Sequence, residues 1–159
     1  MDVGTVIDGR YQLLRALGEG GSGDVFAAYD LKDRAEVAVK VQSEQTFELS
    51  EDFASNSEFL AGEAQNLGSL SGIRGIPKFR VEGVYQSRRY IVMDLVNGMT
   101  LVDFIVNPGA QRTAVAASVL GQLCEILHSV HSRGLVHRDI KRRGTENVQA
   151  HFCGGQFCA

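Results

Sequence analysis

Short runs rich in β-branched and aromatic residues, separated by glycine-rich or charged turns, fill the first third of the chain. Runs of this kind are typical of strands, and three in succession predict an antiparallel meander. They cover residues 11–17, 24–29 and 36–41. Two further runs, 78–85 and 88–96, are joined by Gln86 and Ser87 and predict a hairpin.

One helical pattern lies between these two groups of strands, over residues 58–70. Apolar side chains recur there with the spacing of one helix face. They are Leu60, Ala64 and Leu67. Ser55 and Glu58 have the spacing of a capping box, which predicts that the helix starts beside them. The pattern therefore predicts a five-stranded antiparallel sheet with one helix.

The second half of the chain has a mainly helical pattern. A turn at residues 97–98 precedes a short helical run over 101–106. A longer helix is expected over residues 115–130 and should end near Gly134. Its apolar stripe comprises Val115, Val119, Leu123, Ile126, Leu127 and Val130. Because this stripe is broad, we expect it to be exposed unless later helices cover it.

The composition is that of a globular protein able to bury one sizeable core: 159 residues, of which 44% are apolar and 22% are charged. A net charge of −3 and the lack of a long basic run exclude nucleic acid as a favoured partner. The N-terminus lacks a secretory signal, and no window approaches the roughly 18 apolar residues of a membrane span. We therefore expect a cytoplasmic protein with no membrane span in this chain.

Three cysteines and one nearby histidine raise the question of a disulfide or a metal site. Cys124 lies within the long helical pattern, whereas Cys153 and Cys158 stand near the last residue. An odd number of cysteines without a signal peptide favours reduced thiols. His151 lies beside two of them, but the spacing does not match a zinc site, so no metal ligand is predicted.

A glycine-rich segment between the first two predicted strands is the first candidate for chemistry. Gly18, Gly20 and Gly23 form the pattern G-x-G-x-x-G, in which the backbone can approach phosphate oxygens closely. In a dinucleotide-binding unit the same spacing leads into a helix, whereas here it leads into the strand-like run 24–29. A flexible hairpin tip is the plain alternative.

A lysine stands within the third predicted strand. Three valines alternate along one face of this strand, and Ala38 and Lys40 share the other face. The lysine could extend along the strand to solvent, or its ammonium group could face a phosphate, with the small Ala38 leaving room for a flat base.

The glycine pattern, followed by V-A-V-K at residues 37–40, resembles the signature of the protein kinase family. The resemblance implies that residues 18–25 cover ATP and that Val25 and Ala38 contact the adenine. It also implies that Lys40 holds the α- and β-phosphates. The implied ATP-binding residues are Leu17, Gly18, Glu19, Gly20, Gly21, Ser22, Gly23, Val25, Ala38, Lys40, Met93, Asp94, Leu95 and Val96.

Two further segments fit the resemblance. Glu63 matches the helix glutamate that pairs with the strand lysine in kinases. Glu58 is a rival on the same helix, and a solvent-facing charge is the plain alternative for Glu63. Residues 90–101 resemble the kinase hinge, which implies that Met93 lies behind the nucleotide pocket and that backbone groups of residues 94–96 face the adenine.

The string H-R-D-I-K over residues 137–141 resembles the kinase catalytic loop, and its lysine resembles that of Ser/Thr kinases. In that role Asp139 accepts or orients the proton of the attacking hydroxyl, and Lys141 neutralises charge on the transferred phosphoryl group. Arg138 would pair with a phosphorylated activation segment. The implied catalytic residues are Lys40, Glu63, Asp139 and Lys141. The chain thus resembles the eukaryotic-type (Hanks-type) Ser/Thr protein kinases, in their bacterial form.

The kinase pattern breaks directly after Lys141. The family has an asparagine five residues after the catalytic aspartate, but that position is Gly144, and Asn147 lies three residues later. No aspartate follows Asp139, so the D-F-G motif is missing and the usual Mg²⁺ ligands are not found. A change of reading frame is our preferred hypothesis for this break. A genuine truncated product and a divergent pseudokinase are the alternatives.

Four segments are expected: an N-terminal segment, 1–10, a kinase N-lobe with its hinge, 11–96, a partial C-lobe with two helices, 97–141, and an aberrant tail, 142–159. The expected fold class is α+β, with a kinase-like N-lobe and the first helices of an incomplete helical C-lobe. The expected function is ATP-dependent phosphoryl transfer to Ser/Thr hydroxyls of a protein substrate, with Mg²⁺ as the family's usual metal. We expect this chain alone to be inactive. The alternative is a catalytically dead nucleotide-binding or pseudokinase interaction module.

Overall fold

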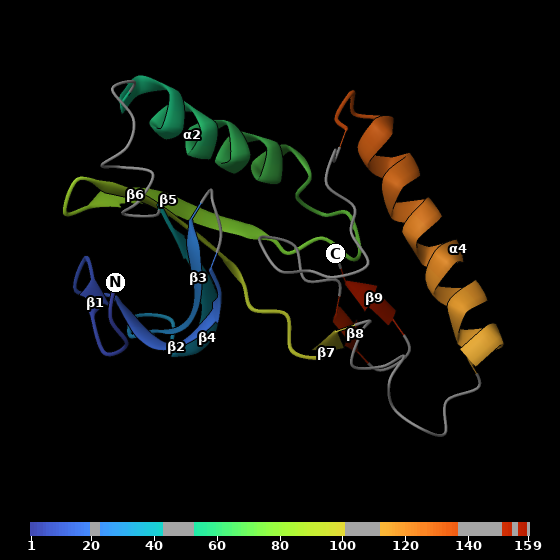
Figure 1. Ribbon diagram of the computed structural model, residues 1–159, viewed down its shortest axis with the longest axis horizontal. Helices are drawn as coiled ribbons and strands as arrows, with labels where there is room; N and C mark the ends of the chain where they lie inside the picture. The colour runs from blue at the N-terminus through green and yellow to red at the C-terminus, as the bar shows by residue number, and fades with distance from the viewer. Residues whose placement is uncertain (20–22, 43–52, 101–111, 137–150, 154–155, 159) are drawn as a thin grey trace. The chain divides into compact units, whose positions relative to one another are not determined.

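A computed structural model describes residues 1–19, 23–42, 53–100, 112–136, 151–153 and 156–158 (Figure 1). The chain divides into two compact units. The first contains residues 1–69 and 78–95, and the second contains residues 70–77 and 96–144 with most of the tail. The expected short helix at 101–106 lies outside the described residues.

The first unit is built, among its described residues, on an antiparallel sheet of six strands in the order β1-β2-β3-β4-β6-β5. The strands are β1 (Val6–Ile7), β2 (Tyr11–Gly18), β3 (Asp24–Asp30), β4 (Ala35–Val41), β5 (Phe79–Tyr85) and β6 (Arg88–Asp94). Helix α2 (Phe53–Ser69) packs against β5 and β6 (Figure 1). The five expected strands and the helix are confirmed. Strand β1 is additional, because its two residues are too few to show a strand period in the sequence.

The turn between β5 and β6 consists of Gln86 and Ser87, so the predicted hairpin is confirmed. Both residues have left-handed backbones, with φ of 49° and 64°, and Tyr85 pairs directly with Arg88. Two central residues with positive φ are typical of a type I′ turn, whose twist matches that of the flanking strands.

Alternation along the strands separates a buried core face of the sheet from a second face. The core face carries Ile7, Tyr11, Leu13, Phe26, Ala28, Val37, Val39, Val41, Tyr90 and Val92, all of them buried. Full burial of each of the larger aliphatic side chains contributes about 1.5–3 kcal/mol. On the second face Ala64 of α2 packs with Ile91 of β6, and Leu67, Phe79 and Met93 surround this contact. Apolar side chains are therefore buried on both faces of the sheet.

Helix α2 begins at Phe53, five residues earlier than the pattern at 58–70 predicted. Ser55 consequently lies inside the helix, and the predicted capping box at Ser55 and Glu58 is wrong. Residues three apart in sequence are also neighbours on one face within a helix, so this spacing does not by itself mark a helix start.

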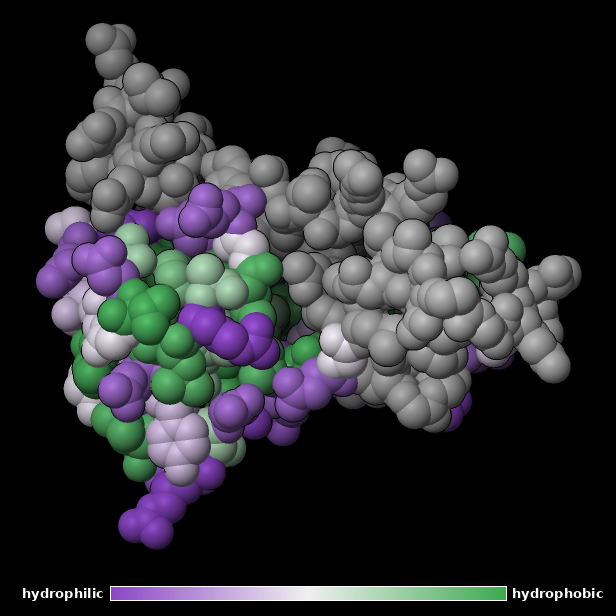
Figure 2. Space-filling view, turned by 60° about the horizontal axis from the view of Figure 1, so that its bottom comes forward, coloured by the Kyte–Doolittle hydropathy of each residue, from purple (hydrophilic) through white to green (hydrophobic). Residues whose placement is uncertain are grey.

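Apolar side chains also reach the surface of the first unit. Figure 2 shows hydrophobic residues beside hydrophilic ones on the face of this unit that the view presents. The exposed large apolar residues described in this unit are Val3, Val6, Leu14, Leu31, Val81 and Val84. Individually exposed apolar residues are ordinary for a globular protein.

The second unit contains one described helix, α4 (Arg112–His131), and a described three-stranded sheet in the order β7-β8-β9. The strands are β7 (Met99–Thr100), β8 (His151–Cys153) and β9 (Gln156–Cys158). Met99 pairs with Phe152, and Phe152 pairs in turn with Phe157. Part of the segment that we expected to be an aberrant tail therefore forms two strands of a sheet.

The apolar stripe of α4 is covered in part. Val119, Ile126 and Val130 are buried. Leu70, Ile73, Ile76, Leu123 and Leu135 pack against them. The expectation of an exposed stripe is therefore wrong at these positions, because residues 70–76, which follow α2 in the chain, lie against α4. Their irregular spacing gave no sign of this contact in the sequence.

Helix α4 ends close to Gly134, as predicted. The Gly134 N–H donates to the His131 carbonyl at 2.9 Å, and the Leu135 N–H donates to the Val130 carbonyl at 3.4 Å. With Gly134 at a φ of 75°, these two bonds form a Schellman motif, for which glycine is favoured. Neither of the described helices has the length and apolar character needed to cross a bilayer.

Candidate nucleotide-binding site

Lys40 of β4 and Glu63 of α2 form an ion pair on the second face of the sheet. The Lys40 Nζ lies 2.8 Å from Glu63 Oε1 and 2.6 Å from Oε2. The Lys40 side chain is 1% exposed, whereas that of Glu63 is 30% exposed. The structure therefore brings together the two residues that the sequence analysis paired, and Lys40 does not extend to solvent. The Glu58 side chain lies outside the described side chains.

The surroundings of Lys40 set its electrostatics. Burial lowers the pKa of Lys40 below its ordinary value, and the charge and hydrogen bonds of Glu63 act in the opposite direction. A buried ammonium group is costly unless an anion and hydrogen-bond acceptors surround it. Glu63 supplies both, so it keeps a positive charge available on the second face of the sheet.

The register of the strands places the predicted nucleotide-binding residues side by side. Residues directly opposite each other in an antiparallel pair share a face of the sheet. Val25 pairs with Gly18 on one side and with Lys40 on the other, and Lys40 pairs with Ile91. Ala38, two residues before Lys40, is 6% exposed and pairs with Met93. One continuous surface thus carries predicted site residues from β2, β3, β4 and β6.

The glycine-rich segment leaves β2 at Gly18 and joins β3 after Gly23. Gly23 has a φ of 149°, and a Cβ atom there would lie 2.5 Å from the carbonyl oxygen of Val41. Only glycine fits this approach of two backbones. Leu17 is half-buried and Glu19 is exposed, whereas residues 20–22 lie outside the described residues.

The end of β6, where the hinge was predicted, is bonded to Lys78, which precedes β5, and to Arg80 of β5. The Asp94 N–H donates to the Lys78 carbonyl at 3.0 Å, and Arg80 Nε donates to Asp94 Oδ1 at 2.7 Å. Met93 packs with α2, and Leu95 and Val96 are half-buried. The first predicted hinge residue therefore has a defined position within the first unit.

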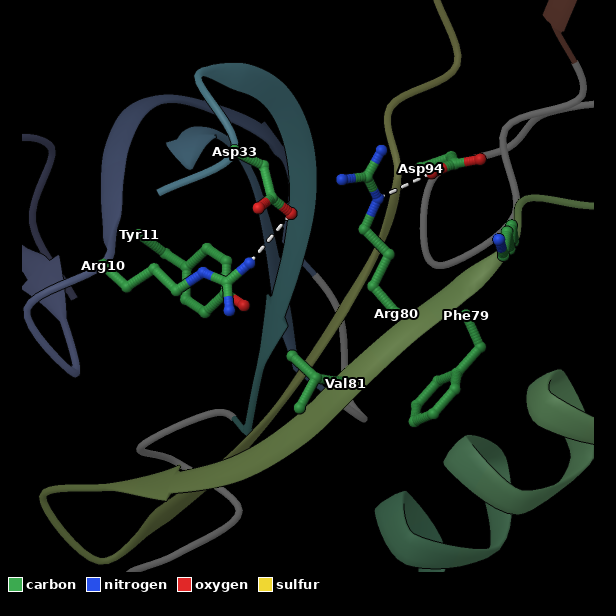
Figure 3. A pocket seen from close by; sticks show the side chains of 8 residues that line it. Arg10, Tyr11, Asp33, Phe79, Arg80, Val81 and Asp94 are labelled. Carbon is green, nitrogen blue, oxygen red and sulfur yellow. Dashed lines mark hydrogen bonds and ion pairs between the residues drawn. The ribbon is translucent and has the colours of Figure 1, made fainter. Parts of the chain in front are cut away.

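A hollow of about 460 Å³ opens beside Arg80 and Asp94 (Figure 3). It is lined by Arg10, Tyr11, Asp33, Lys78, Phe79, Arg80, Val81 and Asp94. Asp94 is the one predicted site residue among them, and neither Lys40 nor Glu63 lines the hollow. This hollow is therefore distinct from the face that carries the ion pair.

A second ion pair, which the sequence analysis missed, ties the N-terminal segment to the sheet. Arg10 donates to both carboxylate oxygens of Asp30, at 2.8 and 2.7 Å, and to Asp33 at 3.0 Å. Asp30 is fully buried and also accepts the backbone N–H groups of Lys32 and Asp33. The hydrogen bonds from Arg10 hold the pKa of Asp30 well below its ordinary value. The position of Asp30 at the start of a charged turn could have indicated its bonds to the following N–H groups, since aspartate often caps turns in this way.

The predicted catalytic loop lies outside the described residues, including Arg138, Asp139 and Lys141. Gly144 and Asn147 lie there too. Among the described residues, no three His, Cys, Asp or Glu side chains are grouped so that they could hold a metal ion. The described residues therefore include Lys40 and Glu63 but not the predicted catalytic loop.

Comparison with known proteins assigns the family. Residues 11–148 match the family described as "Protein kinase domain", and the chain belongs to that protein kinase family. It is 35% identical over 144 residues to the serine/threonine-protein kinase PrkC of Bacillus subtilis, covering 89% of this chain and 21% of that protein. It is 34% identical over 146 residues to the serine/threonine-protein kinase PknA of Mycobacterium tuberculosis, covering 87% of this chain and 32% of that protein. The chain therefore spans between a fifth and a third of these relatives.

Solved structures show the same fold. The chain superposes on a mutant of the Mycobacterium tuberculosis PknI kinase domain with a TM-score of 0.66 and 23% identity, covering 89% of this chain and 56% of that one. A double mutant of the same domain gives a TM-score of 0.70 and 20% identity, covering 99% of this chain and 60% of that one. The α+β, kinase-like fold expected from the sequence is confirmed.

Proposed function

We propose that this chain binds ATP on the second face of its first unit, and that a kinase containing it phosphorylates Ser or Thr hydroxyls of a protein substrate. The observation that carries the proposal is the Lys40–Glu63 ion pair, with Nζ 2.6–2.8 Å from both carboxylate oxygens. It lies on the surface shared by Gly18, Val25 and Ala38.

The donor set of Lys40 suits a phosphate. An ammonium group has three N–H donors, and two of them are directed at the oxygens of Glu63. One donor therefore remains for a phosphate oxygen, and burial strengthens its electrostatic attraction. The close backbone approach at Gly23 supports the same reading, because a side chain there would displace the glycine-rich segment.

The neighbouring positions suit a flat base. Ala38 is small and nearly buried, and Val25 and Met93 flank it on adjacent strands. Backbone groups of Asp94, Leu95 and Val96 would bind the adenine edge. These apolar contacts would hold the base, while Lys40 would hold the α- and β-phosphates.

ATP supplies the γ-phosphoryl group in this proposal. Asp139 would orient the attacking hydroxyl, and Lys141 would neutralise charge on the phosphoryl oxygens. Mg²⁺ usually bridges the phosphates in this family, and the family's asparagine position is Gly144 here. We therefore propose that ATP binding to this chain is weak and insensitive to Mg²⁺, and that the chain alone does not transfer phosphate.

A second candidate function is a catalytically dead nucleotide-binding or interaction module that acts on a partner kinase. The sequence at position 144 favours it, because glycine cannot replace the side-chain oxygen of an asparagine metal ligand. Both candidates include nucleotide binding, and they differ in whether a longer kinase that contains this chain transfers phosphate.

The test uses a fluorescent ATP analogue displaced by ATP, with and without EDTA. We expect displaceable binding that Lys40→Met weakens at least tenfold and that EDTA leaves within about twofold of its value with Mg²⁺. Absence of displaceable binding would refute the proposed ATP site. Transfer of labelled γ-phosphate to a generic protein substrate, lost in Asp139→Ala, would show that this chain is an active kinase. It would refute both the interaction module and our proposal that the chain alone does not transfer phosphate.

A further inference from the structure

Arg88, the first residue of β6, is a buried arginine close to Asp24, the residue that follows Gly23. It is 6% exposed, and its Nε donates to the backbone carbonyl of Gln42 at 2.6 Å. Its guanidinium also lies 3.7 Å from a carboxylate oxygen of Asp24. Arginine is seldom buried without such partners. The kinase resemblance gives Arg88 no role, so its position needs another explanation.

Arg88 contacts one residue at the start of β3, Asp24, and one residue just after the end of β4, Gln42. Asp24 is the first residue of β3 and follows Gly23 directly, so it marks the point where the glycine-rich segment rejoins the sheet. Gln42 follows the last residue of β4 and stands two positions after Lys40. Asp24 also pairs with Val41 across the sheet.

Gln42 is itself fixed to the start of β6. Its N–H donates to the Arg89 carbonyl at 2.9 Å, and its side-chain oxygen accepts the Arg89 N–H at 3.3 Å. Gln42 is 6% exposed, so few water molecules can compete for these bonds. The end of the lysine strand therefore has little freedom relative to Arg88.

We propose that Arg88 is a positioning residue. By holding Asp24 and the Gln42 carbonyl together, it keeps the point where the glycine-rich segment joins β3 at a fixed distance from Lys40. This raises the affinity for nucleotide. This inference rests on the proposed ATP site. A phosphate bound by both the segment and Lys40 requires these two groups to keep their spacing. The backbone of Gly23 lies so close to that of Val41 that no side chain fits between them. The charge attraction between Arg88 and Asp24 opposes movement of Asp24 away from β4.

The test is the Asp24→Asn variant of the whole chain. Asparagine keeps the shape of the side chain and removes the charge, and Asp24 is partly exposed, so the variant should fold. The matched control is Asp33→Asn, which removes an aspartate paired with Arg10 beyond the opposite end of β3. Arg88→Lys is a second variant, because lysine keeps the charge but lacks the fork that reaches both partners.

Two readouts are needed: the Kd for a fluorescent ATP analogue, and hydrogen exchange in a peptide spanning residues 23–26. We expect Asp24→Asn to raise the Kd about threefold to tenfold and to speed the exchange, while Asp33→Asn changes neither. Arg88→Lys should act in the same direction if it folds.

The outcomes separate this inference from the proposed function. If the unmodified chain binds the analogue and Asp24→Asn leaves both the Kd and the exchange unchanged, the inference is wrong and the ATP site stands. Equal effects of the two asparagine variants would also overturn it, since they would show a general loss of stability. If the unmodified chain binds no analogue, the ATP site and the claim about affinity are both refuted. Hydrogen exchange in residues 23–26 then decides whether Arg88 holds Asp24 in place.

Discussion

The hydroxyl of Tyr90 in β6 donates a hydrogen bond to the carboxylate of Asp8, which lies 82 positions earlier in the chain. Tyr90 is 4% exposed, and burial, followed by the hydrogen bond to Asp8, raises the pKa of its phenol. Its ring also belongs to the core face of the sheet, beside Tyr11. One side chain therefore links the N-terminal segment to the core of the first unit.

Removal of this hydroxyl should destabilise the unit. We expect Tyr90→Phe to lower the free energy of unfolding by about 1–2 kcal/mol, because a bond to a charged acceptor is lost while the ring stays in place. Urea unfolding followed by circular dichroism measures the change. Tyr85→Phe is the control, since the described bond of that hydroxyl is an exposed one of 3.5 Å. Equal losses for the two variants would contradict a special role for the Asp8 bond.

A methyl group at Gly83 should displace the same ring. A Cβ atom there would lie 2.5 Å from the Tyr90 hydroxyl oxygen and from Cζ, so the two groups must move apart, and we expect the bond from Tyr90 to Asp8 to weaken. We expect Gly83→Ala to cost about 1–3 kcal/mol of stability. Gly62→Ala in α2 is the matched control: its Cβ meets nothing within 4 Å, and alanine should stabilise the helix by up to about 1 kcal/mol.

The coupling of these sites is a further check on Gly83. Since we expect Gly83→Ala to weaken the bond to Asp8 already, adding Tyr90→Phe should cost less in that background than in the unmodified chain. Additive losses in thermal or urea unfolding would mean that the methyl group acts elsewhere.

The two members of the Lys40–Glu63 pair should respond unequally to substitution. Lys40 is almost fully buried and Glu63 is partly exposed. Glu63→Gln leaves a buried ammonium group without an anion, which should cost about 2–4 kcal/mol of stability. Lys40→Met leaves Glu63 free to hydrate and should cost less than about 1 kcal/mol, although it removes the proposed phosphate donor. The comparison of two unfolding curves tests this order, and a costlier Lys40→Met would reverse our account of the pair.

Acid should weaken the first unit through Asp30. The pKa of this carboxyl is below its ordinary value of 3.8 in the folded chain, mainly because Arg10 hydrogen-bonds to it. The unfolded chain therefore binds a proton more readily, so the stabilisation is complete well above pH 4 and is lost as the pH falls below that value. Asp30→Asn should lower the urea midpoint at pH 7 and flatten its decline between pH 5 and pH 3.

Asp33→Asn is the control for this prediction, because Asp33 is half exposed and its pair with Arg10 is screened by water. Its unfolding midpoint should follow that of the unmodified chain at each pH. A variant Asp30→Asn with an unchanged acid slope would show that other carboxylates cause the acid sensitivity.

The parts of the fold that could be predicted from the sequence are those with a local period. The alternating valines of β4 and the hairpin at Gln86 and Ser87 need only near neighbours in the chain, and both are confirmed. Strand β1 has too few residues for a period, and the start of α2 was misplaced because a capping box and a helix face share one spacing.

The residues of the candidate site that could be predicted are those that belong to a recognisable motif. Family motifs identified Lys40 and Glu63, whose separation of 23 positions is bridged by a recognisable strand and helix. Arg88 and Gln42 lie 46 positions apart and carry no motif, so only the strand register of the folded sheet shows that they meet. Arg10 and Asp30 were missed for the same reason.

The N-terminal segment also changes where this lobe should be considered to begin. The family match starts at Tyr11, and a chain shortened to that residue would lose both Asp8 and Arg10. Tyr90 and Asp30 would then keep their buried positions without the side chains that now bind them. A folding unit should include every residue whose side chain satisfies a buried polar group. Here the N-terminal boundary of the unit therefore lies before Tyr11, where the family match starts.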